Sequence, residues 1–249
     1  MASETTRRYE AAAQDADRRP LVRAVFTMIG AAAAIFVVGL VLGLVFVGRH
    51  GGGPIQGWDN RVQAWDLHHR AGLVGVSKVI AFVGDAPKLA VVAVILAAII
   101  WAVWRTVWAL LPLAAYFGGE FQVFIIREVI HRPRPPTANY PAPGAIPGVH
   151  ETSFSFPSGH SVAVTAILFA LAGAAFYTIR AWWPWVLALL LSLFVIYSRL
   201  VLGVHWFSDV TFGFILGVAW GVTVARVFRS LEWADFLAWL PAGWSRNRR

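Results

Sequence analysis

The stretch VFTMIGAAAAIFVVGLVLGLVFV, residues 25–47, is almost entirely apolar and contains no charged residue. It is longer than the roughly 20 residues that a helix needs to cross about 30 Å of hydrocarbon. The apolar core of a signal peptide is usually about 7 to 15 residues long, and no small-residue cleavage pattern follows this run. We therefore expect a retained membrane span here.

Further apolar runs of similar length follow this one and bring the expected number of spans to six. They lie at residues 81–104, 106–126, 161–179, 181–198 and 206–225. Between the first and second spans, residues 58–70 (WDNRVQAWDLHHR) have the pattern of a short amphipathic helix at the membrane surface. The sequence predicts an all-α fold, a six-transmembrane-helix bundle with a short interfacial helix after the first span.

The composition supports a membrane protein. Hydrophobic residues make up 58% of the 249 residues and charged residues only 14%, against about 25% charged in soluble domains. There is no cysteine, which excludes disulfides and thiolate metal sites. The net charge of +8 comes mostly from the tails and one motif region, without a long basic stripe, so we do not expect nucleic-acid binding.

The placement of arginine indicates how the chain is oriented. We expect residues 1–20 to be a disordered cytoplasmic tail, residues 21–229 to form the six-span domain, and residues 230–249 to be an interfacial or cytoplasmic tail. With the N-terminus in the cytoplasm, most arginines outside the motif region lie on the cytoplasmic side. The sequence thus predicts a multi-pass cell-membrane protein, and its Ala- and Arg-rich, Lys-poor composition favours a bacterial plasma membrane.

The first cluster of polar residues at a span end is REVIHRPRP, residues 127–135. Because the residue before a proline is pushed out of helical geometry, the third span should end before Pro133. Arg127 then lies on the last turns and Arg134 just outside the helix. Two planar guanidinium groups suit the binding of phosphate oxygens. The structural alternative is a charged flank that anchors the span to lipid headgroups.

The second cluster, FPSGH at residues 156–160, directly precedes the fourth span. Ser158 is a natural N-cap, and Gly159 lets a ligand approach the backbone. The free amides of a helix N-terminus form an anion site, where His160 can supply a proton. An ordinary cap with an interfacial histidine is the alternative.

The third cluster consists of Ser198-Arg199, His205 and Asp209. His205 and Asp209 are four residues apart at the head of the sixth span and are predicted to share a helix face. Asp209 can then hold one imidazole nitrogen and leave the other free to attack. A structural His–Asp pair is the alternative. All three clusters fall on the same, outward side of the six-span arrangement, which favours a single site.

With these three clusters the chain resembles the type 2 phosphatidic acid phosphatases, a superfamily that also includes glucose-6-phosphatase and vanadium haloperoxidases. The family pattern is a basic residue followed by Arg-Pro, then Pro-Ser-Gly-His, then Ser-Arg with a His and an Asp. The chain carries these pieces in the family's order and spacing: Arg127 to Arg134-Pro135, Pro157-Ser158-Gly159-His160, and Ser198-Arg199 to His205 and Asp209. One departure is Arg127, where the family usually has lysine.

The resemblance implies a role for each matched residue. It implies that His205 attacks phosphorus and becomes a phosphohistidine, that Asp209 orients it, and that His160 protonates the departing oxygen. It also implies that the phosphate oxygens are held by Arg127, Arg134, Arg199, Ser158 and the amide of Gly159. Fixed arginines can replace a metal, and no carboxylate cluster suited to two metals accompanies the motifs. No cofactor and no metal are therefore expected.

The expected function is a membrane lipid phosphatase whose site is extracytoplasmic. Its partner is a lipid phosphate or diphosphate: phosphatidic acid, phosphatidylglycerol phosphate or a polyprenyl diphosphate. The alternatives are a lipid phosphotransferase with the same intermediate and a transporter, which intramembrane charges favour in general. The sequence does not indicate an oligomeric state.

Three further features are interpreted from sequence alone. Glu120 lies inside the third span, about 10 Å along the helix from Arg127, and is expected to be structural. His68 and His69 are expected on the surface helix, where a metal site would need further partners. The segment 136–150, rich in proline and glycine, is either a lid or a connector.

Overall fold

The computed structural model describes residues 4–140 and 153–231. These residues form helices and no strand. The longer helices are α1 (Glu4–Leu42), α2 (Gln56–His69), α3 (Val74–Val83), α4 (Ala86–Trp104), α5 (Leu111–Ile130), α6 (Gly159–Ile179), α7 (Trp183–Val201) and α8 (Phe207–Arg229). A short π-helix, η1 (Gly43–Val47), extends α1, and short 3₁₀ segments, η2 (Val107–Leu110) and η3 (Thr137–Asn139), precede α5 and follow it.

Six helical segments are long and apolar enough to cross a membrane, as the sequence predicted. They are Leu21–Val47, Ala86–Trp104, Val107–Ile130, Gly159–Ile179, Trp183–Val201 and Phe207–Arg229. The second begins later than expected, because residues 81–83 are the last residues of the separate helix α3, whose C-cap is Gly84. The additional helix α3 was not predicted.

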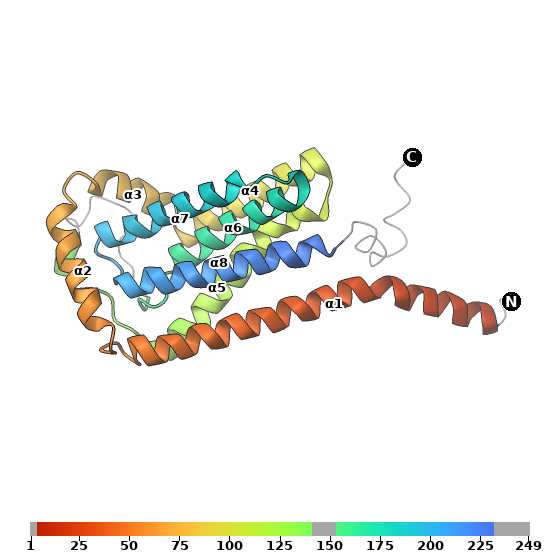
Figure 1. The fold of residues 1–249 in the computed structure, drawn as a ribbon, viewed down its shortest axis with the longest axis horizontal. Helices are drawn as coiled ribbons and strands as arrows, with labels where there is room; N and C mark the ends of the chain where they lie inside the picture. The colour runs from red at the N-terminus through yellow and green to blue at the C-terminus, as the bar shows by residue number, and fades with distance from the viewer. Residues whose placement is uncertain (1–3, 141–152, 232–249) are drawn as a thin grey trace.

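Residues 4–20, which the sequence assigns to the N-terminal tail, are the first part of α1. The stretch EAAAQDADRR at residues 10–19 consists mainly of good helix formers. Extending a helix that already exists adds one hydrogen bond per residue and avoids the cost of nucleation. The helix of the first span therefore continues beyond its apolar part. In Figure 1, this end of α1 projects away from the bundle.

Helix α6 occupies the centre of the bundle, where it packs against α5, α7 and α8. Its contact with α8 is close because small residues lie between the two helices. A Cβ on Gly221 would lie 2.5 Å from the carbonyl oxygen of Ala166, and a Cβ on Gly217 would lie 2.7 Å from that of Val162. Small residues at such contacts let two backbones approach within a membrane.

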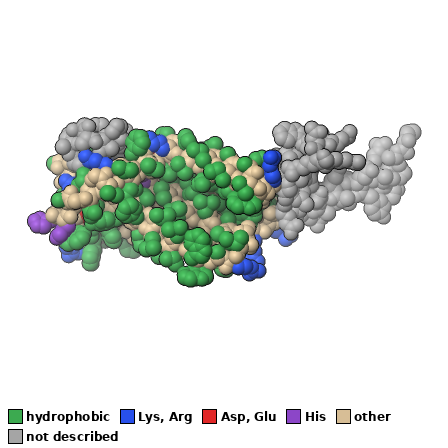
Figure 2. All heavy atoms as spheres, turned by 90° about the horizontal axis from the view of Figure 1, so that it is seen from above, with side chains coloured by type: hydrophobic (Ala, Val, Ile, Leu, Met, Phe, Trp, Pro, Cys, Tyr) green, Lys and Arg blue, Asp and Glu red, His purple; other side chains and the backbone are tan. Residues whose placement is uncertain are grey.

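The outer surface of the bundle is apolar along its length. In Figure 2, hydrophobic side chains cover the sides of the molecule, while Lys and Arg gather toward its two ends. On α5, for example, Phe117, Phe121 and Phe124 are each more than half exposed. Such a surface is suited to contact with lipid. The chain is accordingly a multi-pass membrane protein.

Helix α2 lies across one end of the bundle, beside the last turns of α7 and the first turns of α8 (Figure 1). Helix α3 packs against α7 at the same end. The motif-bearing ends of α5, α6, α7 and α8 all lie at this end, as the six-span arrangement predicted. The site is therefore covered by a helix that belongs to the loop after the first span.

Candidate active site

The end of α5 places two arginines. Arg127 lies in the last turn, and the helix ends at Ile130, before Pro133 as predicted. His131 follows in the left-handed conformation, with φ of 52°, which turns the chain away from the helix axis. Nε of Arg127 donates to the carbonyl oxygen of Pro157 at 3.1 Å. This contact ties the end of α5 to the segment that begins α6.

The guanidinium of Arg134 is held on three sides. Its Nε donates to the carbonyl oxygen of Ser153 at 2.8 Å, and its Nη1 donates to that of Val204 at 2.9 Å. Its Nη2 donates to Oγ of Ser153 at 3.1 Å, and Nη1 of Arg127 lies 3.3 Å from the same oxygen. The two guanidinium groups thus converge on one oxygen atom.

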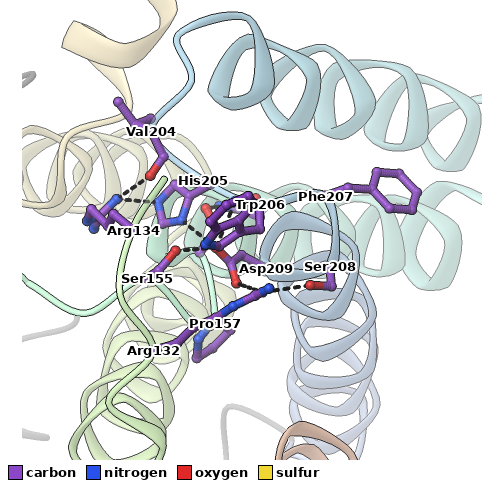
Figure 3. A network of polar contacts seen from close by, with 12 residues as sticks. Arg132, Arg134, Ser155, Pro157, Val204, His205, Trp206, Phe207, Ser208 and Asp209 are labelled. Atoms are coloured by element: carbon purple, nitrogen blue, oxygen red, sulfur yellow. Dashed lines mark hydrogen bonds and ion pairs between the residues drawn. The ribbon is translucent and has the colours of Figure 1, made fainter. Parts of the chain in front are cut away.

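His205 faces Arg134 with one ring nitrogen and Asp209 with the other (Figure 3). Nη1 of Arg134 lies 3.0 Å from Nε2 of His205. Because a guanidinium only donates, this Nε2 must be the acceptor, with its lone pair directed at Arg134. The proton of a neutral ring then sits on Nδ1, 3.4 Å from Oδ2 of Asp209. The geometry thereby selects one tautomer.

Asp209 lies in the first turn of α8, but His205 lies before the helix, which begins at Phe207. The expected shared helix face is therefore wrong in detail. Instead, Oδ2 of Asp209 accepts a hydrogen bond from the backbone N–H of Trp206 at 2.9 Å, which caps the helix. The same oxygen accepts from the hydroxyl of Ser155. Asp209 thus faces His205 across the capping turn rather than along a helix.

Ser158 is the N-cap of α6, as predicted, and its hydroxyl accepts from the N–H of Ser161 at 3.5 Å. Its own N–H donates to the carbonyl oxygen of Asp209 at 3.1 Å, which joins the beginning of α6 to α8. A Cβ on Gly159 would lie 3.4 Å from Nη2 of Arg127 and 3.5 Å from Oε1 of Glu120. The absence of a side chain here therefore keeps the helix N-terminus open toward Arg127.

His160 lies half-buried in the first turn of α6, and its Nε2 is 3.3 Å from the carbonyl oxygen of Ala81 in α3. A carbonyl only accepts, so Nε2 of His160 carries a proton. The two histidines therefore differ: His205 presents a lone pair at Nε2 and His160 a proton. The ring of His160 contacts α3 through this hydrogen bond.

Arg199 is 2% exposed and lies in the last turn of α7. Its carbonyl oxygen accepts from the N–H of Val204 at 3.3 Å, which folds the 202–206 segment back beneath the helix end. Arg199 thus lies beside the segment that carries His205. Glu120, expected to be structural, reaches the N-terminus of α6 with Oε1 near Gly159.

Sequence reasoning assigned no role to several polar residues around this site. Ser153 bridges the two arginines, and Ser155 contacts Asp209. Arg132, which lies inside the 127–135 cluster, is completely buried, and so is Asp59 of the predicted surface helix. The feature of the sequence that could have indicated a buried acidic face is the spacing of Asp59 and Asp66, which places both carboxylates on one face of α2.

Other predicted features lie apart from the site. His69 donates from Nδ1 to the carbonyl oxygen of Trp65 at 2.7 Å, within α2. Within residues 4–140 and 153–231, no three His, Asp or Glu side chains form a group able to hold a metal ion. Most of the 136–150 segment and nearly all of the C-terminal tail lie outside the described residues.

The sequence matches a known protein family. Residues 108–233, about half of the chain, match the PAP2 superfamily. The chain belongs to this superfamily, the class that its six-span fold and three motifs define.

Two proteins with assigned names are similar in sequence. One is phosphatidylglycerophosphatase B of Bacillus subtilis, 33% identical over 121 residues, which cover 46% of this chain and 56% of that protein. The other is undecaprenyl-diphosphatase of Sulfolobus acidocaldarius, 37% identical over 68 residues, which cover 26% of this chain and 30% of that protein. The chain thus aligns with about half of the first and less than a third of the second.

A solved structure extends the likeness over most of the fold. It is the crystal structure of a transmembrane PAP2-type phosphatidylglycerolphosphate phosphatase from Bacillus subtilis. The TM-score is 0.58 at 25% sequence identity, and the match covers 83% of this chain and 92% of that one. The likeness therefore reaches beyond the motifs to the arrangement of the helices.

Proposed function

We propose that this protein is a membrane lipid phosphatase that hydrolyses a lipid phosphate or diphosphate through a phosphohistidine at His205. The observation that carries the proposal is the orientation of His205. Its Nε2 lone pair faces Arg134, while Nδ1 faces Asp209. A nucleophile with an orienting carboxylate, placed against a phosphate-binding cation, is the arrangement that phosphoryl transfer needs.

The neighbouring cations are placed to hold the transferred group. Arg127 and Arg134 both reach Oγ of Ser153, so the two guanidinium groups can share one oxygen atom. A phosphate oxygen would make the same contacts with a stronger, charge-assisted character. The open N-terminus of α6 at Gly159 adds backbone donors. Such fixed donors stabilise charge on the equatorial oxygens without reorganising during the reaction.

In the proposed first step, Nε2 of His205 bonds to phosphorus as the bond from phosphorus to the lipid oxygen breaks. His160, protonated on both ring nitrogens, gives one proton to that oxygen, so the lipid leaves as a neutral alcohol or, from a diphosphate, as a lipid monophosphate. In the second step, His160 takes a proton from water as the water oxygen attacks phosphorus. The bond to His205 then breaks, and inorganic phosphate leaves.

The substrate class and the side of the membrane are part of the proposal. The named relatives act, by their names, on phosphatidylglycerophosphate and undecaprenyl diphosphate, both phosphorylated lipids. Arg105, Arg180 and Arg229 lie at the helix ends opposite the site. With these arginines in the cytoplasm, the site faces outward.

The test is phosphate release by the purified protein in detergent or lipid. The panel should contain phosphatidic acid, phosphatidylglycerol phosphate and a polyprenyl diphosphate, with His205→Ala alongside. We expect phosphate release from at least one lipid, inhibition of this activity by vanadate, and no loss of activity when a chelator is added. We also expect an acid-labile phosphoenzyme that is absent in His205→Ala. Near-normal turnover in a well-folded His205→Ala variant would rule out His205 as the nucleophile. Strong inhibition by the chelator would rule out metal independence, and transfer to an alcohol without phosphate release would indicate a phosphotransferase.

A further inference from the structure

A buried network lies on the side of Asp209 that faces away from His205. At its centre is Arg132, which is 0% exposed. Its Nη1 donates to Oδ1 of Asp209 at 2.6 Å, and its Nη2 donates to Oδ2 of Asp59 at 2.5 Å. Figure 3 shows the guanidinium of Arg132 reaching Asp209 and Ser208. One buried cation therefore lies between two buried carboxylates from different helices.

Ser208 closes the network. Its N–H donates to Oδ1 of Asp59 at 2.8 Å and its hydroxyl donates to Oδ2 of Asp59 at 2.6 Å. The same hydroxyl accepts from Nη1 of Arg132 at 2.7 Å. Ser208 directly precedes Asp209 in the first turn of α8. Asp59 thus joins helix α2 to the turn that carries the carboxylate beside His205.

The network fixes the orientation of the Asp209 carboxylate. Its Oδ1 is held by Arg132, and its Oδ2 accepts from Ser155 and from the backbone of Trp206. Every one of these donors limits rotation of the carboxylate relative to Nδ1 of His205. Nε of Arg132 has no hydrogen-bond partner, but both of its terminal nitrogens are bonded. Such buried hydrogen bonds are strengthened by the low local dielectric.

The charges also suit the reaction. Asp59 and Asp209 are acidic and Arg132 is basic, so the three buried side chains together carry one surplus negative charge. When Nε2 of His205 bonds to phosphorus and Nδ1 keeps its proton, the imidazole ring becomes positive. Without Asp59, the charge of Arg132 would largely cancel that of Asp209 as seen from His205. Asp59 thus leaves the Asp209 charge available to the ring, in surroundings where buried charges interact strongly.

We propose that Asp59 and Arg132 are positioning residues for the His205–Asp209 pair. Arg132 fixes the Asp209 carboxylate, and Asp59 fixes Arg132 and offsets its charge. Helix α2 is then a functional part of the active site. The inference rests on the proposed function, because it assigns Asp209 the role of orienting a nucleophilic His205.

The test compares two isosteric changes on the same helix. Asp59→Asn keeps the shape and removes the charge that offsets Arg132. Asp66→Asn is the matched control: it lies seven residues further along α2, is also buried at 1% exposure, and belongs to a different cluster beside Arg70 and Tyr197. We expect Asp59→Asn to lower kcat by about 10- to 100-fold with KM changed less than about threefold, and Asp66→Asn to leave both parameters unchanged.

The double variant Asp59→Asn/Arg132→Gln separates charge from structure. It removes both charges and leaves that of Asp209 uncancelled, so we expect a kcat above that of Asp59→Asn alone. Residues in one network show such non-additive effects. A kcat for Asp59→Asn equal to that of Asp66→Asn would overturn the inference. So would a double variant that falls by the product of the two single losses, with Arg132→Gln measured alone beside it, since additive free-energy losses show that the two residues act independently.

The proposed function is tested separately in the same assay. Wild-type protein and His205→Ala are measured for phosphate release and for the phosphoenzyme. If wild type releases no phosphate, or His205→Ala retains turnover, the proposed function fails. If both behave as expected but Asp59→Asn retains normal kcat, only the role of Asp59 and Arg132 fails.

Discussion

Nη1 of Arg134 lies 3.0 Å from Nε2 of His205, so the nitrogen that attacks phosphorus in the proposed reaction is held by the guanidinium that we propose to bind phosphate. The contact keeps the lone pair of Nε2 directed toward the place where a phosphate would bind. A bound phosphate oxygen would take over this donor of Arg134, because charge-assisted bonds are the stronger ones. In the proposed reaction, the same guanidinium therefore orients the nucleophile before binding and holds the phosphate afterwards.

Replacing Arg134 by lysine tests this double role. Arg134 uses its Nε, Nη1 and Nη2 for contacts with Ser153, Val204 and His205. A single ammonium cannot span these partners, although it keeps the charge. We expect Arg134→Lys to lower kcat/KM by about 10²- to 10³-fold and to weaken inhibition by vanadate. The measurement is steady-state phosphate release with a vanadate titration.

Arg61→Lys is the matched control for Arg134→Lys. Arg61 lies on α2 at the same end of the molecule and stacks over Trp58, 4.6 Å from the ring centroid. We expect its kcat/KM to equal that of wild type. Equal losses in the two variants would show that the assay reports general damage at this end of the bundle.

Arg127 is the position where the family usually has lysine, and its contacts predict that lysine is tolerated. Its Nε contact with Pro157 and its Nη1 contact with Ser153 are 3.1 and 3.3 Å long, and a lysine can replace one of them while keeping the charge. We expect Arg127→Lys to stay within about tenfold of wild-type kcat/KM, since one lost hydrogen bond is worth about 1 kcal/mol. Arg127→Ala should lose at least about 10²-fold. A lysine variant as inactive as the alanine variant would show that the guanidinium fork is required.

Much of the fold and the site could be predicted because the deciding signals are local. The thickness of the hydrocarbon fixes the length of a span, so six apolar runs gave six membrane helices. Pro133 predicted the end of α5, and Ser158 predicted the beginning of α6. Once these ends were placed, the motifs had to meet at one end of the bundle.

The orientation of α2 could not be predicted because its polar face is the buried one. Trp58 and Trp65 are 61% and 56% exposed, whereas Asp59 and Asp66 are buried. An amphipathic pattern normally places the apolar face inward, and here the helix covers a polar site instead. The partners of Asp59 are Arg132 and Ser208, 73 and 149 positions away. A single sequence does not show contacts over such separations.

Asp66 predicts that the stability of the protein depends on pH. It lies on α2, outside the membrane-spanning helices, and burial raises the pKa of its carboxyl to about 6, against the opposing effects of Arg70 and His69. The folded protein therefore binds this proton more tightly than the unfolded chain does. The sign follows from this: the contribution of Asp66 to stability falls as pH rises from about 4 to about 6 and stays low above that range.

Asp66→Asn removes this titration. We expect its Tm to vary less than that of wild type between about pH 4 and pH 7, and to be higher than that of wild type at pH 7.5. The measurement is thermal unfolding in detergent, followed by tryptophan fluorescence in a series of buffers. Parallel curves for the two proteins over this range would show that another group causes the dependence.

The contact between α6 and α8 predicts that Gly221 cannot take even a methyl group. A Cβ at this position would lie 2.5 Å from the carbonyl oxygen of Ala166, a backbone atom that can move only if the helices separate. We expect Gly221→Ala to lower stability by about 1–3 kcal/mol, a fall in Tm of about 2–10 °C for a chain of this size. Gly30→Ala is the control, because a Cβ on Gly30 in α1 meets nothing within 4 Å. Its Tm should stay level or rise, since alanine is the better helix former. Equal falls in Tm for the two variants would show that the loss of glycine itself, rather than the close approach of α6 and α8, lowers the stability.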